Sequence, residues 1–299
     1  MATQSLARGG APGGPEARPA RRMAWRRFRG NGVAVASAAF LLLMYALAAG
    51  GPLISPYPPN AVDIMNANAR PSPAHWLGTD ENGRDVLARV IAGARTTMTV
   101  GLIAMVIAVV IGACAGSLGG YFGGWADAVL MRFTDGMMAI PYFFLVLIVV
   151  AVFGSSFRNI LAAIGVTSWM VVARIVRGDV LRYRGLDFVL AARALGARSA
   201  RILVRHIVPQ AAPSIIVAAT FGVANAILLE SALSYLGLGI QAPQASWGNM
   251  LSNAQAYVWE NPLLPVYPGL LILVTVLAYN FLGDALRDAL DPRYRESDV

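Results

Sequence analysis

Six apolar runs without a charged residue limit what this chain can fold into more than any other feature of its sequence. A transmembrane α-helix needs about 20 mostly apolar residues. Inside a bilayer the backbone polar groups must bond within the protein, so runs of this length favour helices. The runs cover residues 33–54, 96–119, 136–157, 159–173, 214–229 and 261–283. They predict an all-α polytopic membrane protein with six transmembrane helices.

Three details of the runs carry further expectations. Pro141 lies inside the third run, where it predicts a kink because proline removes a helix hydrogen bond. The fourth run is short, so we expect its helix to continue through residues 174–181, with Arg174 extending its charge toward the membrane surface. At the end of the second run and just beyond it, glycines recur every four residues, which predicts close packing against another helix of this subunit or of a partner. These glycines are Gly112, Gly116 and Gly120.

The basic residues fix the expected orientation. All 24 of them are arginine. With the N-terminus inside, nineteen fall in cytoplasmic segments, and such a bias is typical of the cytoplasmic side of a membrane protein. The remaining five fall outside, namely Arg70, Arg84, Arg89, Arg95 and Arg158. An even number of spans places both termini in the cytoplasm.

The same count divides the chain into segments. We expect a disordered, arginine-rich cytoplasmic tail at the N-terminus rather than a cleaved signal peptide, because the run that follows is long enough to span. The expected segments are the tail 1–32, the first transmembrane helix 33–54, an extracytoplasmic segment 55–95, a five-helix core 96–283 that includes the cytoplasmic loop 178–212, and a cytoplasmic C-terminal tail 284–299.

The cytoplasmic loop has the pattern of two short helices. Asp187 is placed to cap the first helix, and Gly196 to end it in the left-handed conformation. Ser199 is placed to cap the second, which is expected to run up to Pro209. A structured helix-glycine-helix loop on a membrane protein indicates a surface that is offered to a partner outside the membrane.

The sequence excludes several kinds of site. A phosphate-binding loop of the GxxxxGK[ST] type would need a lysine, and the chain has none. Cys114 is the single cysteine, which leaves no internal disulfide and no cysteine-based metal site. The two histidines, His75 and His206, are expected on opposite sides of the membrane and so form no metal site. The spans contain no constellation of acid, base and nucleophile, which argues against a membrane enzyme.

Two acidic residues are candidates for a pore or gate. Glu230 has the most apolar surroundings of any ionisable residue, and it could attract the amino terminus of a substrate or form a structural pair, for instance with an arginine of the outer face. Asp135 could line the pore or mark the inner entrance of the third span. The broken, charge-free stretch between Glu230 and Trp259 suggests a re-entrant cap at the outer mouth.

Five segments of the sequence resemble a known family. Residues 183–213 resemble the EAA loop of ATP-binding-cassette (ABC) importer permeases, with Ala191, Ala192, Gly196 and Pro209 in register. The chain departs from that pattern where Leu190 replaces the glutamate, His206 replaces an isoleucine and Val208 replaces a leucine. Residues 75–95, 127–141 and 230–250, with 283–292, resemble further blocks of the dipeptide/oligopeptide (peptide/nickel) family, second-permease type.

This resemblance implies a type I ABC importer permease fold in a bacterial inner membrane. The chain would form half of the translocation pathway for di- or oligopeptides. Its partners would be a homologous second permease, two cytoplasmic ATPase subunits or domains, an extracytoplasmic substrate-binding protein and membrane lipid, with no nucleic acid. The subunit itself would bind no cofactor and catalyse no reaction, since ATP and Mg²⁺ would sit on the ATPase partners. Coupling to the ATPase would fall to Asp187, Phe188, Leu190, Ala191, Ala192, Gly196, His206 and Pro209.

Other functions stay open at this point. The same fold also imports nickel and other small solutes. A self-sufficient channel or proton-coupled transporter is a further alternative, although it would need buried acidic and basic residues in several spans, and these spans carry almost none. For the segment 75–95, which carries charges of both signs, a solvated loop and a docking surface for a partner are both possible.

The arginine count predicts the side of the membrane on which the loop lies. A reporter enzyme that is active only in the cytoplasm should be active when fused after Arg198 and inactive when fused after Trp76, because the positive-inside bias places these sites on opposite sides. Reporter activity in whole cells measures this, and the reverse pattern would invert the topology.

Overall fold

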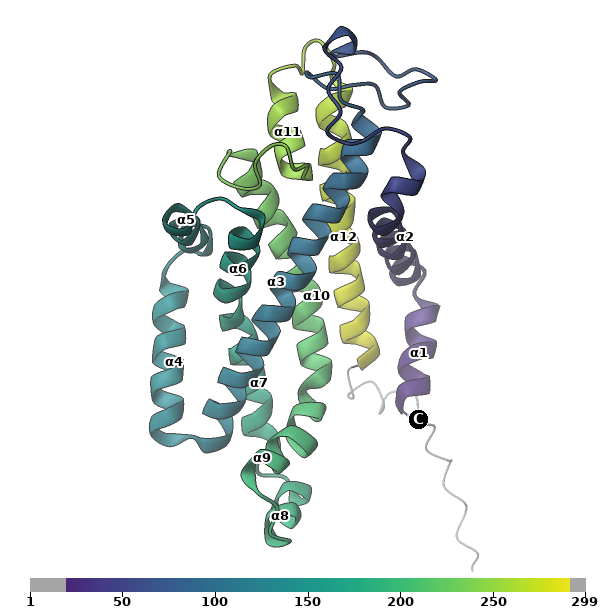
Figure 1. The fold of residues 1–299 in the computed structure, drawn as a ribbon. Coiled ribbons are helices and arrows are strands. Elements are labelled where there is room, and N and C mark those ends of the chain that lie inside the picture. The colour runs from purple at the N-terminus through teal and green to yellow at the C-terminus, as the bar shows by residue number, and fades with distance from the viewer. Residues whose placement is uncertain (1–19, 291–299) are drawn as a thin grey trace, which may run out of the picture.

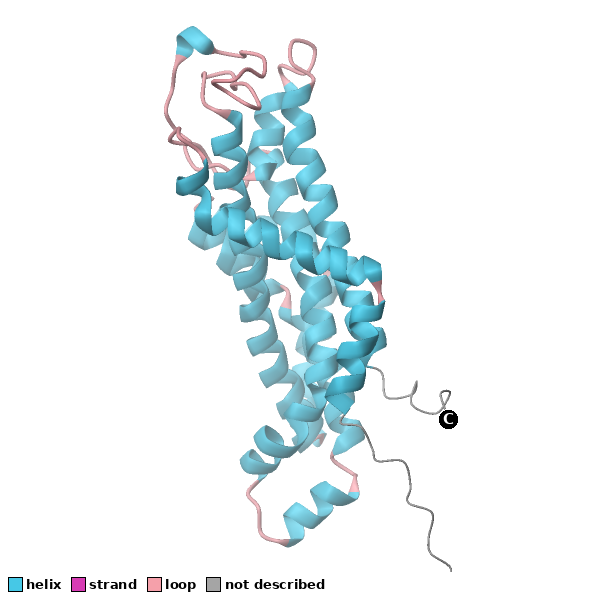
Figure 2. Ribbon diagram, turned by 90° about the vertical axis from the view of Figure 1, so that its right-hand side faces the viewer, coloured by secondary structure: helices cyan, strands magenta, loops and turns pink. Residues whose placement is uncertain are grey.

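The computed structural model describes residues 20–290, and its regular elements are helices (Figures 1 and 2). Helix α1 (Ala20–Gly30) precedes α2 (Gly32–Ile54). The side chain of Asn31 caps α2 by accepting hydrogen bonds from the backbone N–H groups of Val33 and Ala34, both at 3.1 Å. The expectation that the tail 1–32 is disordered is therefore wrong for residues 20–30, which are helical; residues 1–19 lie outside the described part of the chain.

Helix α3 (Val86–Phe122) is the long diagonal helix of the bundle (Figure 1). It begins ten residues before the second apolar run, because the side chain of Asp85 accepts the N–H of Ala88 at 2.8 Å and caps the helix there. Its 37 residues correspond to about 55 Å of helix. That length exceeds a hydrocarbon core of about 30 Å, and α3 extends well beyond the apolar run at its N-terminal end.

The third apolar run does not form one kinked helix. Helices α4 (Gly124–Ala139) and α5 (Tyr142–Phe153) are bent by 89° where Pro141 separates them, so the break predicted at Pro141 is present but is sharper than a kink within one helix. The run begins in the last turn of α4 and continues along α5, whose 12 residues reach only about 18 Å. By length and composition five helical segments can cross a membrane, and six if this bent pair counts as one span.

The fourth run extends as expected. Helices α6 (Phe157–Thr167) and α7 (Trp169–Tyr183) meet at Ser168 and together form one candidate span of 27 residues. The remaining long helices are α10 (Val208–Tyr235) and α12 (Leu263–Leu290). Since α12 continues to residue 290, the start of the segment 284–299 is helical and extends the last span.

The short elements lie at the two ends of the bundle (Figure 1). A 3-10 turn, η1 (Ile64–Asn66), and helix α11 (Trp247–Gln255) lie at one end. Helix α8 (Asp187–Ala194), helix α9 (Ser199–Ile202) and the π-helical turn η2 (Leu203–Ile207) lie at the other, as do α1 and the end of α12. Segments expected outside the cell thus share one end, and segments expected in the cytoplasm share the opposite end.

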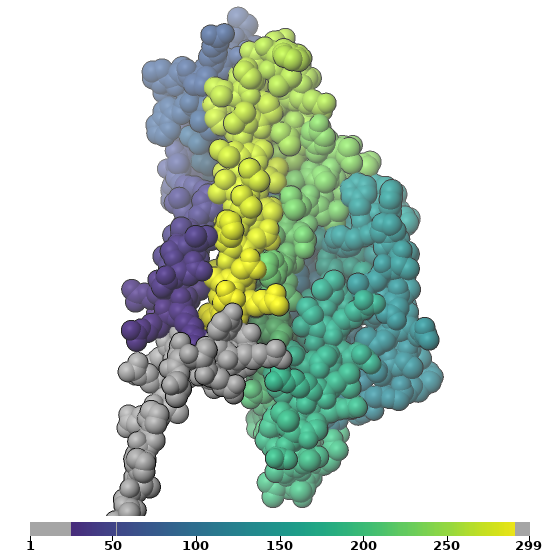
Figure 3. Space-filling view, turned by 180° about the vertical axis from the view of Figure 1, so that it is seen from behind, coloured from purple at the N-terminus to yellow at the C-terminus, as the bar shows by residue number. Residues whose placement is uncertain are grey.

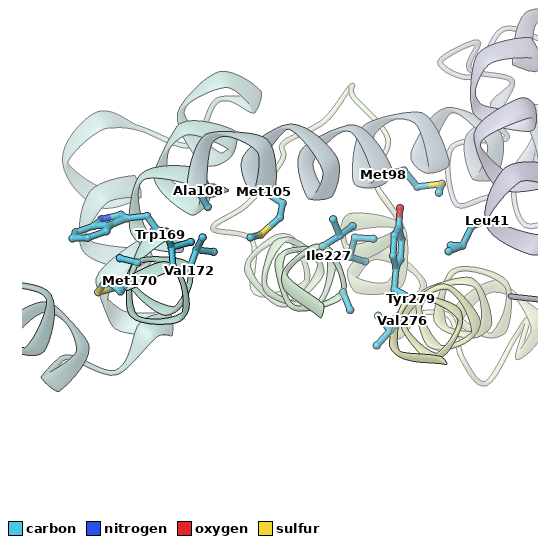
Figure 4. Packing of buried hydrophobic residues seen from close by; sticks show 14 of the residues in the cluster. Leu41, Met98, Met105, Ala108, Trp169, Met170, Val172, Ile227, Val276 and Tyr279 are labelled. Carbon is cyan, nitrogen blue, oxygen red and sulfur yellow. The ribbon is translucent and has the colours of Figure 1, made fainter. Parts of the chain in front are cut away.

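The buried core follows the length of α3 (Figure 4). Met105 and Ala108 of α3 lie toward Val172 of α7, while Met98 lies near Tyr279 of α12. The Tyr279 hydroxyl shares a 2.6 Å hydrogen bond with the hydroxyl of Tyr45, which ties α2 to α12. From behind, α12 is flanked by α1 and α2 on one side and by α10 on the other (Figure 3). The apolar core therefore joins all of the long helices through α3.

The glycine stripe of α3 packs against α7, as its spacing predicts. A Cβ atom at Gly116 would lie 2.3 Å from the carbonyl oxygen of Ala173, and one at Gly112 would lie 2.6 Å from that of Trp169. At Gly120 a Cβ atom would lie 2.9 Å from the Cβ of Val180. No L side chain fits at such distances, so the two backbones approach as closely as they do only because the stripe is glycine.

Gly116→Ala should therefore destabilise the protein. The added methyl group must push α3 away from α7, which should cost about 1–3 kcal/mol of unfolding free energy. Thermal unfolding of the detergent-purified protein measures the change. Gly178→Ala is the matched control, because that helical glycine of α7 has no neighbouring atom within 4 Å. Equal shifts for the two variants would contradict the close-packing role of Gly116.

Candidate functional site

Helix α8 projects from the end of the bundle that also holds α1 (Figure 2). Asp187 lies in its first turn, but Leu186 occupies the capping position and no side chain caps the helix. The predicted cap at Asp187 is therefore wrong. The carboxylate still lies at the positive end of the helix dipole, where negative charge is favourable.

The end of α8 has the geometry that the sequence predicts. Gly196 has a φ angle of +79°, in the left-handed region. Its N–H donates to the carbonyl of Arg193, and the N–H of Ala197 donates to that of Ala192, both at 3.0 Å. This pair of bonds is a Schellman motif, which fixes the direction in which the chain leaves a helix. The turn between α8 and α9 is thus held by backbone bonds that need glycine at this position.

The second helix of the loop differs from the prediction at both of its ends. Ser199 is the first residue of α9, and its side chain makes no capping bond, so the predicted cap is wrong. Pro209 does not end the helix either. The chain passes from α9 through the π-helical turn η2 into α10, and Pro209 lies in the first turn of α10, where a missing N–H costs little. The loop is therefore continuous with the span that follows it.

His206 lies in the π-helical turn and is half-buried. No group of three or more histidine, cysteine, aspartate or glutamate side chains in residues 20–290 is arranged to hold a metal ion.

Helix α8 presents apolar side chains in two directions. Val189 is fully buried and joins the bundle core together with Ile202 of α9. Phe188 and Leu190 are 39% and 48% exposed, and Leu195 just beyond the helix is 89% exposed. Ala191 is also exposed, whereas Ala192 packs partly against the core. One face of α8 anchors the loop, and the other leaves an apolar surface outside the bundle.

Two arginines of the loop brace it against the end of α3. Arg184 donates a hydrogen bond from Nη1 to the carbonyl oxygen of Gly120 at 2.8 Å. The guanidinium of Arg193 lies 5.9 Å from the ring centroid of Tyr121, within the range of a cation–π contact. The sequence analysis missed both contacts. The excess of arginine in this loop was the available signal, but it indicated only the side of the membrane.

Two aspartates connect α4 to α7. Asp127 and Arg177 form a two-pronged ion pair with distances of 2.5 and 2.7 Å. Arg174 pairs with Asp135 at 2.6 Å. Both side chains of that second pair are about half exposed, and an exposed pair contributes little to stability. Asp135 therefore contacts an arginine of the neighbouring helix α7.

Glu230 lies near the opposite end of the bundle and has no exposed surface. Its Oε1 accepts a hydrogen bond from the hydroxyl of Ser234 at 2.7 Å, and that hydroxyl accepts the N–H of Ile240 at 3.0 Å. Among the described residues, no arginine forms an ion pair with Glu230. The suggested pairing with an arginine of the outer face is therefore wrong. In this conformation the carboxyl group links α10 to the segment after it.

That segment folds back over the bundle as the sequence suggests. Ser246 and Asn249 form a reciprocal capping box at the start of α11. Trp247 is fully buried; its indole N–H donates to the carbonyl of Val90 at 3.1 Å, and its backbone N–H donates to the hydroxyl of Thr97 at 3.2 Å. These bonds pin α11 onto α3 beside Glu230.

Comparison with known proteins identifies this arrangement. The family described as "Binding-protein-dependent transport system inner membrane component" matches residues 108–296. The chain belongs to this family. The N-terminal transmembrane domain of oligopeptide transport permease C matches residues 20–71 of the permease.

Curated relatives and solved structures agree with the family. The permease is 40% identical over 272 residues to the glutathione transport system permease protein GsiD of Pectobacterium atrosepticum, covering 91% of this chain and 90% of the relative. It is 40% identical over 270 residues to the oligopeptide transport system permease protein OppC of Bacillus subtilis, covering 90% and 88%. An inward-facing structure of the MetNI methionine ABC transporter matches with a TM-score of 0.54 at 18% identity, over 68% of this chain and 97% of that one. An amino acid ABC transporter matches with a TM-score of 0.51 at 19% identity, over 68% and 94%. The type I ABC importer permease fold and the multi-pass membrane location are thereby confirmed.

The segment between α2 and α3 is held by its own charges. Arg84 pairs with Asp80 at 2.7 Å and with Glu81 at 2.9 Å. His75 contacts Asp85 at 2.9 Å. Side chains of opposite charge in this segment thus bind one another and hold the loop in an ordered cap. From the sequence, both a solvated loop and a docking surface were possible.

The buried position of Glu230 predicts how the permease responds to its substitution. Glu230→Gln should keep the bond from Ser234, because the amide oxygen can accept it, and should keep solute transport within about twofold of wild type. Glu230→Ala should lose about 2 kcal/mol or more of stability, since it leaves a void and an unpaired hydroxyl. Thermal unfolding and transport by the complete system measure both effects. A severe transport defect in Glu230→Gln with normal stability would instead support direct contact with a positively charged substrate group.

Proposed function

We propose that this permease forms half of the translocation pathway of an ATP-driven importer of di- or oligopeptides and transmits ATP-driven movement through α8. The observation that carries the coupling role is the apolar surface of Phe188, Leu190 and Leu195, which projects from the bundle on a helix braced against α3. The peptide class is supported by relatives at 40% identity that are named for glutathione and oligopeptide transport. The alternative of nickel as the solute finds no support among these names.

The proposed partners follow from the family and from what the chain lacks. A binding-protein-dependent system needs an extracytoplasmic binding protein, and half a pathway needs a homologous second permease. The sequence has no phosphate-binding loop of its own, which supports two separate ATPase subunits or domains as the site of ATP and Mg²⁺. On this proposal the permease binds no cofactor and catalyses no reaction.

The proposed orientation puts both termini and the loop in the cytoplasm of a bacterium. Helix α1, the end of α12 and the loop all share one end of the bundle, in agreement with the arginine count (Figure 1). The ordered cap formed by residues 55–85 and α11 then faces outward, where a binding protein would arrive.

The coupling step is a rigid-body displacement of the loop. The ATPase dimer would hold α8 by its exposed apolar side chains, since Leu190 offers no charge where related loops carry glutamate. Movement would pass to α3 through the bond from Arg184 to Gly120 and to α10 through the unbroken helix that contains η2. A loop with a buried anchor at Val189 can transmit a displacement in this way, whereas a loosely attached loop would absorb it.

Gly196→Val should uncouple transport from ATP hydrolysis. A β-branched residue at a φ of +79° costs about 1–2 kcal/mol, which should lower the population of the docked geometry and peptide uptake by about tenfold. Uptake of a labelled tripeptide and ATP hydrolysis are measured together on the complete system in proteoliposomes, and hydrolysis should persist.

Gly185→Val is the matched control. That glycine lies just before α8, has an ordinary φ angle and has no neighbouring atom within 4 Å. Wild-type uptake in Gly196→Val would refute the coupling role. An equal loss in Gly185→Val would attribute the defect to added bulk at the docking surface rather than to the turn.

A further inference from the structure

A cavity of about 760 Å³ opens near the outer end of the permease. It lies between the end of α2, the first half of α3, the start of α6 and the segment around Gln244. Volumes of about 300–1,000 Å³ are typical of sites that hold small molecules. The cavity is therefore large enough for a small peptide or for a part of a longer one.

One charged side chain, Arg95, lines this cavity. Arg95 is exposed, and among residues 20–290 the structure gives it no ion pair or hydrogen bond. The neighbouring arginines differ, because Arg84 and Arg89 are both paired with Asp80. No acidic residue lines the cavity, so the charge of Arg95 is not neutralised there.

Polar side chains surround Arg95 within the cavity. Thr96, Thr99 and Gln244 lie on its wall, and the amide of Gln244 approaches the hydroxyl of Thr96 at 3.5 Å. Asn60 also lines the cavity, and its side-chain oxygen lies 3.4 Å from the guanidinium of Arg89. An unpaired positive charge among neutral hydrogen-bonding groups and apolar residues is the composition expected of a site for an anionic ligand.

We propose that Arg95 binds a carboxylate of the transported solute as it enters the pathway. The proposal deepens the proposed function and rests on it. A guanidinium presents a planar fork that matches both oxygens of a carboxylate, and partial removal from water strengthens such a pair. A peptide always offers a carboxylate unless its C-terminus is modified, whereas a metal cation would be repelled. Arg95 thus favours peptides over cations at the outer entrance.

A lipid headgroup is a second source of negative charge that could bind Arg95. Arg95 precedes the apolar run 96–119, and an arginine at such a boundary can bind the headgroup of a lipid with a net negative charge. Its place on the wall of a cavity, beside Gln244 and Thr99, favours the solute. The two sources predict different responses to the peptide and to the lipid, which makes them separable.

The test compares trialanine with its C-terminal amide in proteoliposomes that contain the complete system. Arg95→Gln should lower uptake of the free acid about tenfold relative to wild type and change uptake of the amide less than twofold, because only the acid loses a charge-assisted pair. The binding protein is the same in every sample, so its own preference cancels in these ratios. Arg158→Gln is the control, since Arg158 is an exposed arginine at the start of α6 that does not line the cavity.

Lipid composition separates the two anion sources. The ratio of acid to amide uptake in Arg95→Gln should be the same in vesicles of phosphatidylcholine alone and in vesicles that also contain phosphatidylglycerol. If the defect appears only with the anionic lipid, Arg95 binds a headgroup and the proposal is overturned. An equal loss of acid and amide uptake would also overturn it, because it would show a structural role.

Two further outcomes complete the test. Arg95→Lys keeps the charge without the planar fork and should lower uptake of the free acid less than Arg95→Gln does. If the glutamine variant fails to assemble, free-acid and amide uptake are compared in the lysine variant instead. Wild-type protein that imports neither peptide would refute the proposed function itself, and this inference with it. Normal import by wild type with no selective defect in either Arg95 variant would refute the inference alone.

Discussion

The close approach of α3 to α7 is the contact on which the rest of the permease depends. Gly112 and Gly116 let the two backbones meet at distances that a single methyl group would prevent. Helix α3 begins at the end of the bundle that holds α11, and α7 ends at the end that holds α8 (Figure 1). The contact is therefore both a packing interaction and the link between the ordered cap, which α3 carries at its start, and the loop that follows α7.

The loop gains rigidity from three kinds of interaction that reach it independently. Val189 anchors it through apolar burial, Arg184 through a hydrogen bond to the backbone of α3, and Gly196 through the turn that fixes the direction of α9. None of these uses the exposed apolar side chains of α8. Those side chains remain available for a partner, so the residues that position the surface and the residues that form it are different. A substitution in one set need not disturb the other.

The sequence predicted the features that depend on local composition. The apolar runs located the long helices, and Gly196 ended α8, because both outcomes depend on a few neighbouring residues. The predicted caps failed at Asp187 and Ser199, where the chain enters each helix one residue earlier and the capping position falls to Leu186 and Arg198. Pro141 was placed correctly as a break, but its angle of 89° depends on how α4 and α5 pack, and a single sequence carries no such information.

In the candidate site, too, features that depend on local sequence were predicted, and features that depend on contacts between distant segments were not. Phe188 and Leu190 are exposed at the tip of the loop, and the pattern of the sequence was enough to single them out. The partner of Arg174 was not predictable, because Asp135 lies on another helix and chain order does not reveal that the two meet. The cavity around Arg95 is formed by segments as distant as residues 48 and 245, so no local pattern could have indicated it.

The unbroken helix from α9 through η2 to α10 fixes both the distance and the rotation between the loop and Glu230. Residues 199–235 form one candidate span of 37 residues, with the loop at one end and Glu230 near the other. Each residue of an α-helix turns the chain by about 100°, so an insertion between these ends would rotate Glu230 out of its pocket relative to the loop. A π-helical turn is a place where a helix can accommodate one extra residue, and η2 holds such a turn next to the loop. The spacing between the exposed surface of α8 and the pocket of Glu230 can therefore change only in steps that preserve the phase of this helix.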